Sequence, residues 1–180
     1  MRWNYWSWNK FISMKNIKEI NKKIKTHSID KKDVPSSSKK TSSVKFIRYD
    51  TIKKYLNNSL TSLYDCNEKH FGSRLYEFPE DTLLFYNIYD KGNEYQWHVD
   101  ANDENDNFDI KFTVIINLSD TKYKGGEFKI WCLEKPQTIT ELNNPGDMIM
   151  LRSYHLHKVT PVIKGTRKSL LIFLMGPRLQ

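Results

Sequence analysis

Cysteine is scarce in this sequence, and long apolar runs are missing from it altogether. Only two cysteines occur, Cys66 and Cys132, which is too few for a disulfide-stapled scaffold. No run approaches the roughly 18 consecutive apolar residues that would indicate a membrane span. The start, MRWNYWSWNK, also lacks the continuous apolar core of a secretory signal. We therefore expect a cytoplasmic protein that does not enter a membrane.

The excess of basic over acidic residues is confined to the first third of the chain. Residues 1–60 contain 15 Lys and Arg against 4 Asp and Glu, whereas residues 61–180 contain 14 against 17. A basic segment of this kind fits a contact with nucleic acid or with an acidic protein, or a solvated lysine-rich surface. We favour the solvated surface, so nucleic acid is not the favoured partner. The sequence does not indicate an oligomeric state.

At 180 residues, the chain is expected to form one structural domain with its own core. Residues 1–71 are predicted to form a supporting region that contains two helices. Ser13 can cap the first helix, which would run to about Lys25, and Asp50 can cap the second, which would run to about Cys66.

Two further segments of this supporting region have a distinct composition. Residues 28–43 are rich in Ser and Lys and almost without apolar residues, so we predict a mobile loop there. The run VKFIRY, residues 44–49, predicts a strand, and the aromatic residues 3–11 suggest an edge strand.

Residues 72–180 are predicted to form the main β core. Short β-rich runs, most of them separated by turn residues, indicate a sandwich or jelly roll rather than βαβ units. These runs are residues 73–78, 81–89, 94–100, 111–119, 125–133, 146–152, 155–162 and 168–176. The expected fold is therefore mainly β, with two N-terminal helices packed on a β-sandwich.

The segment EYQWHVD places a histidine and an aspartate two residues apart on a predicted strand, at His98 and Asp100. Residues two apart on a strand project to the same face. The run HLHKVTPV offers a second histidine, either His155 or His157. Two histidines and one carboxylate suit non-haem Fe(II) and leave positions for a cosubstrate and dioxygen, although zinc accepts the same ligands.

Arg167 stands ten residues after His157, in the predicted strand RKSLLIF. Its planar guanidinium can hold a carboxylate through two contacts, and a buried cation requires an anionic partner. Ser169 faces the same way and can donate its hydroxyl to the same anion.

Three segments together resemble the iron- and 2-oxoglutarate-dependent dioxygenases, and within them the prolyl 4-hydroxylase-like, PKHD-type group. They are YDKGNEYQWHVDA, FTVIINLSDTKYKGGEFKIW and PGDMIMLRSYHLHKVTPVIKGTRKSL, within residues 82–177. The resemblance implies a double-stranded β-helix, a jelly-roll barrel whose mouth holds the metal. It implies Fe(II) and 2-oxoglutarate, with O2 as oxidant and L-ascorbate as reductant.

The resemblance also assigns roles to individual residues. His98, Asp100 and His157 would bind Fe(II), and the spacing to the downstream motif selects His157 over His155. Arg167 would hold the distal carboxylate of 2-oxoglutarate. Ser169, Tyr89 and Asn117 would complete the cosubstrate site, with Asn117 standing where some members have a tyrosine.

The chemistry implied by the resemblance is hydroxylation of an unactivated C–H bond with release of succinate and CO2. The favoured substrate is a prolyl or other amino-acid side chain in a peptide or protein. The alternatives are a free amino acid, a small metabolite or a nucleic-acid base, and a non-enzymatic binding module with a vestigial site. Around the site, regular alternation along EYQWHVD predicts that Trp97 fills core and that Tyr95 points away from His98, unless a bulge intervenes in the strand.

Overall fold

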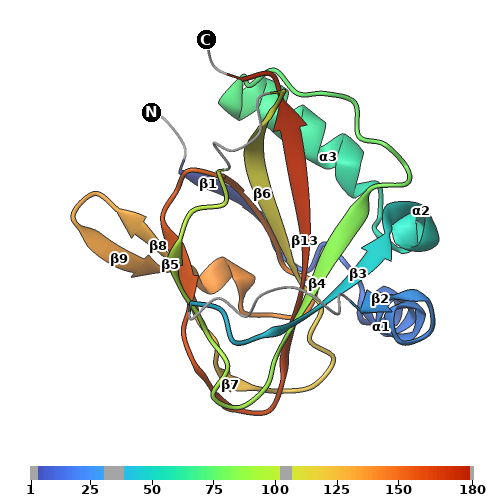
Figure 1. Ribbon diagram of the computed structural model, residues 1–180, viewed down its shortest axis with the longest axis vertical. Helices are drawn as coiled ribbons and strands as arrows, with labels where there is room; N and C mark the ends of the chain where they lie inside the picture. The colour runs from blue at the N-terminus through green and yellow to red at the C-terminus, as the bar shows by residue number, and fades with distance from the viewer. Residues whose placement is uncertain (1–3, 31–38, 102–106, 179–180) are drawn as a thin grey trace.

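Two antiparallel sheets form the framework of the protein (Figure 1). The computed structural model describes residues 4–30, 39–101 and 107–178. The large sheet has seven strands, in the spatial order β1 (Tyr5–Trp8), β10 (Met148–Arg152), β6 (Asp109–Asn117), β13 (Arg167–Gly176), β4 (Leu83–Tyr89), β3 (Ser43–Arg48) and β2 (Ile29–Asp30). The small sheet has the order β5 (Tyr95–His98), β11 (His157–Val159), β8 (Phe128–Cys132) and β9 (Lys135–Thr138).

A third pair joins β12 (Val162–Lys164) to β7 (Lys124–Gly125). From β4 onward, the chain passes repeatedly between the large sheet and the other two, which is the connectivity of a jelly roll. The predicted mainly β fold is confirmed. The run at residues 73–78 is not a strand, because it adds no ladder to either sheet.

The first helix forms as predicted. It is α1 (Met14–His27), and the Ser13 hydroxyl at its N-cap accepts a hydrogen bond of 3.2 Å from the backbone N–H of Asn16. Ile17, Ile20 and Ile24 lie on one face of the helix and are buried in the core against the large sheet.

The prediction of one continuous second helix is wrong. The structure has α2 (Tyr49–Ile52), a 3-10 turn (Lys53–Tyr55), α3 (Ser59–Cys66) and a π-helical turn (Asn67–Phe71). Asn57 and Asn58 interrupt the helix because both adopt left-handed backbone conformations, with φ of 48° and 54°. Asp50 lies in the first turn of α2 and pairs with Arg48 at 2.6 Å instead of capping a long helix.

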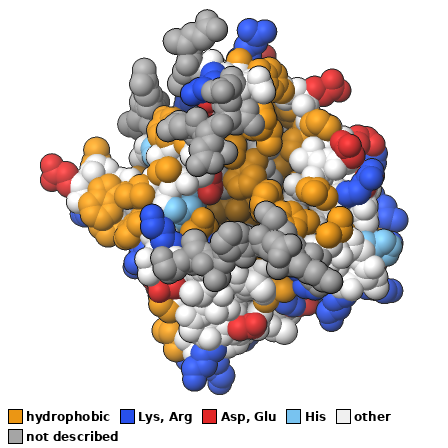
Figure 2. Space-filling view, in the orientation of Figure 1, with side chains coloured by type: hydrophobic (Ala, Val, Ile, Leu, Met, Phe, Trp, Pro, Cys, Tyr) orange, Lys and Arg blue, Asp and Glu red, His pale blue; other side chains and the backbone are white. Residues whose placement is uncertain are grey.

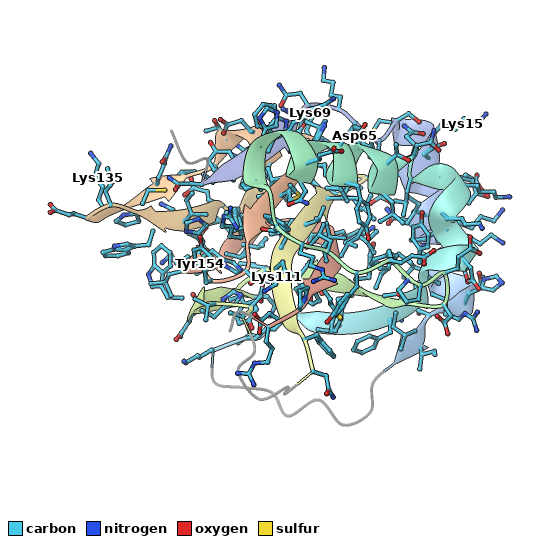
Figure 3. All side chains as sticks on the ribbon, turned by 90° about the horizontal axis from the view of Figure 1, so that it is seen from above. Lys15, Asp65, Lys69, Lys111, Lys135 and Tyr154 are labelled. Carbon is cyan, nitrogen blue, oxygen red and sulfur yellow. The ribbon has the colours of Figure 1, made fainter. Side chains whose placement is uncertain are left out.

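Strand β13 shows how the large sheet separates two environments. Leu170, Ile172 and Leu174 belong to the core that also contains residues of α1, α2 and α3. Arg167 and Ser169 alternate with them and line a cavity between the large and small sheets. Figure 3 shows α3 along one side of the barrel, with the β8–β9 hairpin, which carries Lys135, projecting at the far end.

The predicted N-terminal region is built into the same framework as the core. Strands β1 and β3 belong to the large sheet together with β13 and β4, so the boundary expected at residue 71 does not separate two sheets. Of the predicted mobile loop, residues 31–38 lie outside the described residues. No helix in the described part of the chain is long and apolar enough to cross a bilayer.

Residues 39–43 of that predicted loop are anchored. The backbone N–H of Gln96 donates to Lys39 O at 2.8 Å, and the N–H of Thr41 donates to Glu94 O at 3.1 Å. Between these contacts, Lys40 forms a backbone bridge with Tyr95. Composition alone did not show this pairing, because backbone hydrogen bonds need no particular side chain.

Two glycines with the same backbone conformation provide a test of packing. Gly146 and Gly92 have φ of 85° and 86°, but a Cβ on Gly146 would lie 2.0 Å from Ile12 O, whereas nothing lies within 4 Å of a Cβ on Gly92. We expect Gly92→Ala to cost about 1 kcal/mol and Gly146→Ala at least about 3 kcal/mol in the free energy of unfolding. Urea unfolding measures both values, and equal costs would contradict the close approach of Ile12.

Candidate active site

Two histidines and one aspartate meet between the ends of β5 and β11. His98 and His157 lie directly opposite each other in the β5–β11 ladder. Their Nε2 atoms are 3.6 Å and 3.3 Å from the two carboxylate oxygens of Asp100. One ligand atom from each residue lies within 4.8 Å of the others. The structure thus brings together the three residues that the sequence selected.

The hydrogen bonds of the two imidazoles orient both rings toward a shared centre. Nδ1 of His98 lies 2.7 Å from Gln96 O, and Nδ1 of His157 lies 2.8 Å from His155 O. A carbonyl oxygen only accepts, so each Nδ1 donates its hydrogen, and in the neutral ring each Nε2 presents a lone pair to Asp100.

This arrangement fits a divalent cation. Burial, followed by the neighbouring His157, lowers the pKa of His98 to about 4, so its ring is neutral near pH 7. The neutral ring of His98 and the carboxylate of Asp100 then both offer lone pairs, and a cation between them would accept both. Two histidines and one carboxylate are also the donor set of non-haem Fe(II) sites.

Asp100 is held in its ionised form and in a fixed orientation. Burial alone would raise its pKa, but the hydrogen bond and charge of His157 outweigh burial and lower the pKa. The Thr113 hydroxyl donates to Oδ2 of Asp100 at 2.7 Å. A hydrogen bond from outside the metal ligands orients the carboxylate for coordination.

Arg167 is a cation buried inside the protein. The residue is only 2% exposed. Its Nη1 donates to Ser169 Oγ at 3.2 Å, and its guanidinium carbon lies 5.3 Å from the centre of the Tyr89 ring. Among the described residues, no carboxylate forms an ion pair with it. A buried guanidinium in this state requires an anion from a ligand.

The two histidines and the guanidinium line one cavity. Besides His98, His157, Arg167 and Ser169, its lining includes Tyr89, Tyr95, Ile115, Phe128, Val159 and Leu171. Figure 2 shows apolar side chains gathered in a hollow on this face of the molecule, bordered by charged and histidine side chains. The cavity therefore combines a candidate metal centre with a candidate carboxylate clamp.

Asn117 does not belong to this cavity, and we correct its expected role. Its Nδ2 donates to Leu142 O at 3.0 Å and to the Tyr123 hydroxyl at 3.2 Å, while its Oδ1 accepts from the backbone N–H of Ser119 at 3.1 Å. These contacts occupy the amide, so it connects β6 to the neighbouring turns instead of contacting a cosubstrate.

Tyr95 lines the cavity, on the face that a regular strand would not give it, because a bulge does intervene. Its ring stacks on His98, with the ring centres 3.4 Å apart. The ladder pairs His157 with His98 but Val159 with Tyr95, so β5 contains one extra residue. This bulge reverses the expected alternation, and no turn residue in the sequence marks it.

The remaining aromatic and histidine residues near the site have supporting roles. Trp97 is half-buried and packs edge-on against Trp131 at 5.6 Å instead of filling the core. His155 is half-buried and lies outside the metal-ligand group, as expected. The His70 ring stacks on Trp6, with the ring centres 3.9 Å apart.

Comparisons with known proteins agree with this site. The model of the 2OG-Fe(II) oxygenase superfamily matches residues 84–175. A PKHD-type hydroxylase of Teredinibacter turnerae (strain ATCC 39867 / T7901) is 33% identical over 97 residues, which span 51% of this chain and 42% of that relative. The chain thus matches less than half the length of this curated relative.

Solved structures show the same fold at low sequence identity. A prolyl-4-hydroxylase of Pseudomonas putida has a TM-score of 0.73 and 14% identity, with coverage of 97% of this chain and 94% of that one. A Trichoplax adhaerens prolyl hydroxylase, solved with a peptide fragment of the hypoxia inducible factor oxygen degradation domain, has a TM-score of 0.70, 16% identity and coverage of 95% and 83%. A viral collagen prolyl hydroxylase from Paramecium Bursaria Chlorella virus-1, in its 2OG complex, has a TM-score of 0.68, 15% identity and coverage of 97% of both chains.

These structural relatives confirm the double-stranded β-helix expected from the sequence. The match to the family model spans half of the chain, from β4 to β13. It includes both histidines, the aspartate and the arginine of the cavity. The protein therefore belongs to the 2OG-Fe(II) oxygenase superfamily.

Proposed function

We propose that this protein is an Fe(II)- and 2-oxoglutarate-dependent hydroxylase. The observation that carries the proposal is that His98 and His157, which face the Asp100 carboxylate, line the same cavity as Arg167, a buried guanidinium that forms no ion pair with any described residue. His98, Asp100 and His157 would hold Fe(II). Arg167 would hold the distal carboxylate of 2-oxoglutarate, with Ser169 as a second donor.

Bound Fe(II), 2-oxoglutarate and O2 would supply the oxidising chemistry, with succinate and CO2 as by-products and L-ascorbate as a reductant. The protein would orient the reactants and exclude water. Tyr95 covers the His98 ring, and Phe128 packs against His157 with ring centres 5.4 Å apart. Tyr89 would be positioned by its contact with the Arg167 guanidinium to form one wall of the cosubstrate site.

The proposed substrate is an amino-acid side chain, with a prolyl residue in a peptide or protein as the first candidate. The names of the relatives support this candidate. A row of three phenylalanine rings supports an apolar target group. The row begins next to Thr113, whose hydroxyl binds Asp100. Phe173 pairs with Thr113 in the ladder, and the Phe85 ring lies 5.2 Å from Phe173 and 4.9 Å from Phe46.

Succinate formation tests the proposed activity directly. We expect the purified chain, supplied with Fe(II), 2-oxoglutarate, O2 and ascorbate, to release succinate slowly alone and faster with a substrate. Proline-containing peptides and free amino acids should be screened together, and mass spectrometry should show one added oxygen atom in the product. Failure to convert 2-oxoglutarate under any of these conditions would contradict the proposal.

A further inference from the structure

Lys40 brings a second cation to the edge of the active site. Its backbone is bridged to Tyr95, and the hydrogen bonds of Lys39 and Thr41 fasten the chain to β5 on either side of it. The side chain extends over Tyr95, with Nζ 4.9 Å from the centre of the ring. Since the same ring stacks on His98, Lys40 is one aromatic ring away from the proposed iron ligands.

The polar surroundings of Lys40 are incomplete. Its Nζ donates to Asn87 Oδ1 at 2.8 Å, and no carboxylate among the described residues forms an ion pair with it. Asn87 is only 1% exposed, and its Nδ2 has no hydrogen-bond partner within the described parts of the chain. Two adjacent donors, one of them charged, are therefore held in a largely desolvated place where the described residues provide no anionic acceptor.

This arrangement costs stability unless a ligand completes it. Burial lowers the pKa of the Lys40 ammonium to about 8, although the charge of Asp100 opposes the shift. The group is still mainly protonated at neutral pH. An unpaired buried ammonium and an unpaired buried amide each carry a desolvation penalty, and an anion placed between them would relieve both.

This anion is not 2-oxoglutarate if the proposed function is correct. In that proposal, Arg167 and Ser169 take one carboxylate of the cosubstrate and the metal takes the other. Lys40 and Asn87 do not line the cavity that contains Arg167. Asn87, the partner of Lys40, lies beside Ser169, the partner of Arg167, in the β4–β13 ladder. Lys40 and Arg167 are therefore neighbours that occupy different positions.

We propose that Lys40 and Asn87 form a second carboxylate site, which binds a carboxylate group of the molecule to be hydroxylated. The proposal rests on the proposed function and narrows it to substrates that carry a carboxylate close to the reacting C–H bond. A free amino acid and the C-terminal residue of a peptide both have this chemistry. Asn87 Nδ2 and Lys40 Nζ would each donate one hydrogen bond to the carboxylate.

Matched carboxylates and amides test this site without turnover. We would measure binding by calorimetry to the full chain loaded with Mn(II) and 2-oxoglutarate. The pairs are L-proline, L-leucine and L-lysine with their amides, and peptides ending in proline with a free or amidated terminus. We expect at least one carboxylate to bind about ten-fold or more tightly than its amide, since a charge-assisted hydrogen bond distinguishes them. The pair with the larger difference in affinity shows whether the bound carboxylate belongs to a free amino acid or to the C-terminus of a peptide.

Two variants remove the site and one serves as a control. Lys40→Met should abolish the preference for the carboxylate and, in the absence of ligands, keep or raise the melting temperature. Asn87→Asp should also abolish it, because the new carboxylate would pair with Lys40. Lys39→Met, at an exposed neighbouring position, should keep the preference.

Binding of 2-oxoglutarate separates this proposal from the proposed function. Lys40→Met should bind 2-oxoglutarate as the wild type does, whereas Arg167→Met should not. If Lys40→Met loses 2-oxoglutarate binding to the same degree, Lys40 belongs to the cosubstrate site, and the second carboxylate site is refuted while the proposed function stands. If no carboxylate is preferred over its amide by the wild type, the second site is also refuted. If the wild type does not bind 2-oxoglutarate, the proposed function fails.

Discussion

Alanine in place of His98, Asp100 or His157 is expected to abolish iron binding and turnover. Each substitution removes one of three protein ligands, whereas loss of a single group that only orients a ligand already costs about 10- to 100-fold in affinity or activity. We therefore expect iron affinity to fall by more than about 100-fold. Iron content after anaerobic reconstitution and succinate release measure the two effects.

His155→Ala is the matched control for His157→Ala. The His155 side chain lies outside the metal-ligand group, but its backbone carbonyl accepts from Nδ1 of His157. The alanine variant keeps that carbonyl, so iron content should remain close to the wild-type value. Iron retained by His157→Ala but lost by His155→Ala would show that the wrong histidine has been assigned.

The three alanine variants, each of which lacks one of the proposed iron ligands, should remain folded. None of the three side chains belongs to either hydrophobic core cluster, so truncating one of them removes no apolar core packing. A melting temperature close to that of the wild type would confirm that lost activity reflects a lost ligand. A folded variant that binds iron normally would contradict the assignment of that residue.

The parts of the site that could be predicted from the sequence depend on short, regular geometry. His98 and Asp100 are separated by one residue near the end of a strand, and His157 and Arg167 stand at fixed positions in a motif with turn residues between them. Strand alternation and motif order are both properties of the linear sequence. His98, Asp100 and His157 consequently lie close enough together to share one metal ion, and Arg167 lines the same cavity as the two histidines.

The parts that could not be predicted depend on contacts between distant segments. Tyr95 reaches the cavity through a bulge that is visible only when β5 is paired with β11. Lys40 lies in a segment whose composition suggests a loop but whose backbone pairs with Tyr95. Asn117 has suitable chemistry and a suitable strand position, but Leu142 and Ser119 occupy its amide.

The broken second helix shows the same limit at a local scale. The apolar spacing of residues 52–63 is compatible with one helix. Asn57 and Asn58 nevertheless adopt left-handed conformations, which asparagine tolerates better than most residues. The Asn57 side chain donates to Phe11 O at 2.8 Å, so a contact with the segment before α1 accompanies the break.

Arg167→Lys is expected to raise the requirement for 2-oxoglutarate by about 10- to 100-fold while leaving iron binding nearly unchanged. The guanidinium is a rigid planar donor that matches both oxygens of a carboxylate, whereas an ammonium is a point charge that cannot reproduce both contacts. Losing one charge-assisted hydrogen bond costs about 1.5–3 kcal/mol, which corresponds to this range in affinity. Calorimetric titration with 2-oxoglutarate measures the change.

Arg167→Met should have a larger effect, because the cosubstrate carboxylate would be buried without any counter-charge. The same substitution removes a buried cation that has no ion pair within the described residues, so the melting temperature without ligands should not fall. Arg152→Lys is the matched control, since that guanidinium bonds to Ser73 Oγ and Phe71 O outside the cavity. If both Arg167 variants bind 2-oxoglutarate as the wild type does, Arg167 is not the clamp, and the buried guanidinium must serve a different anion.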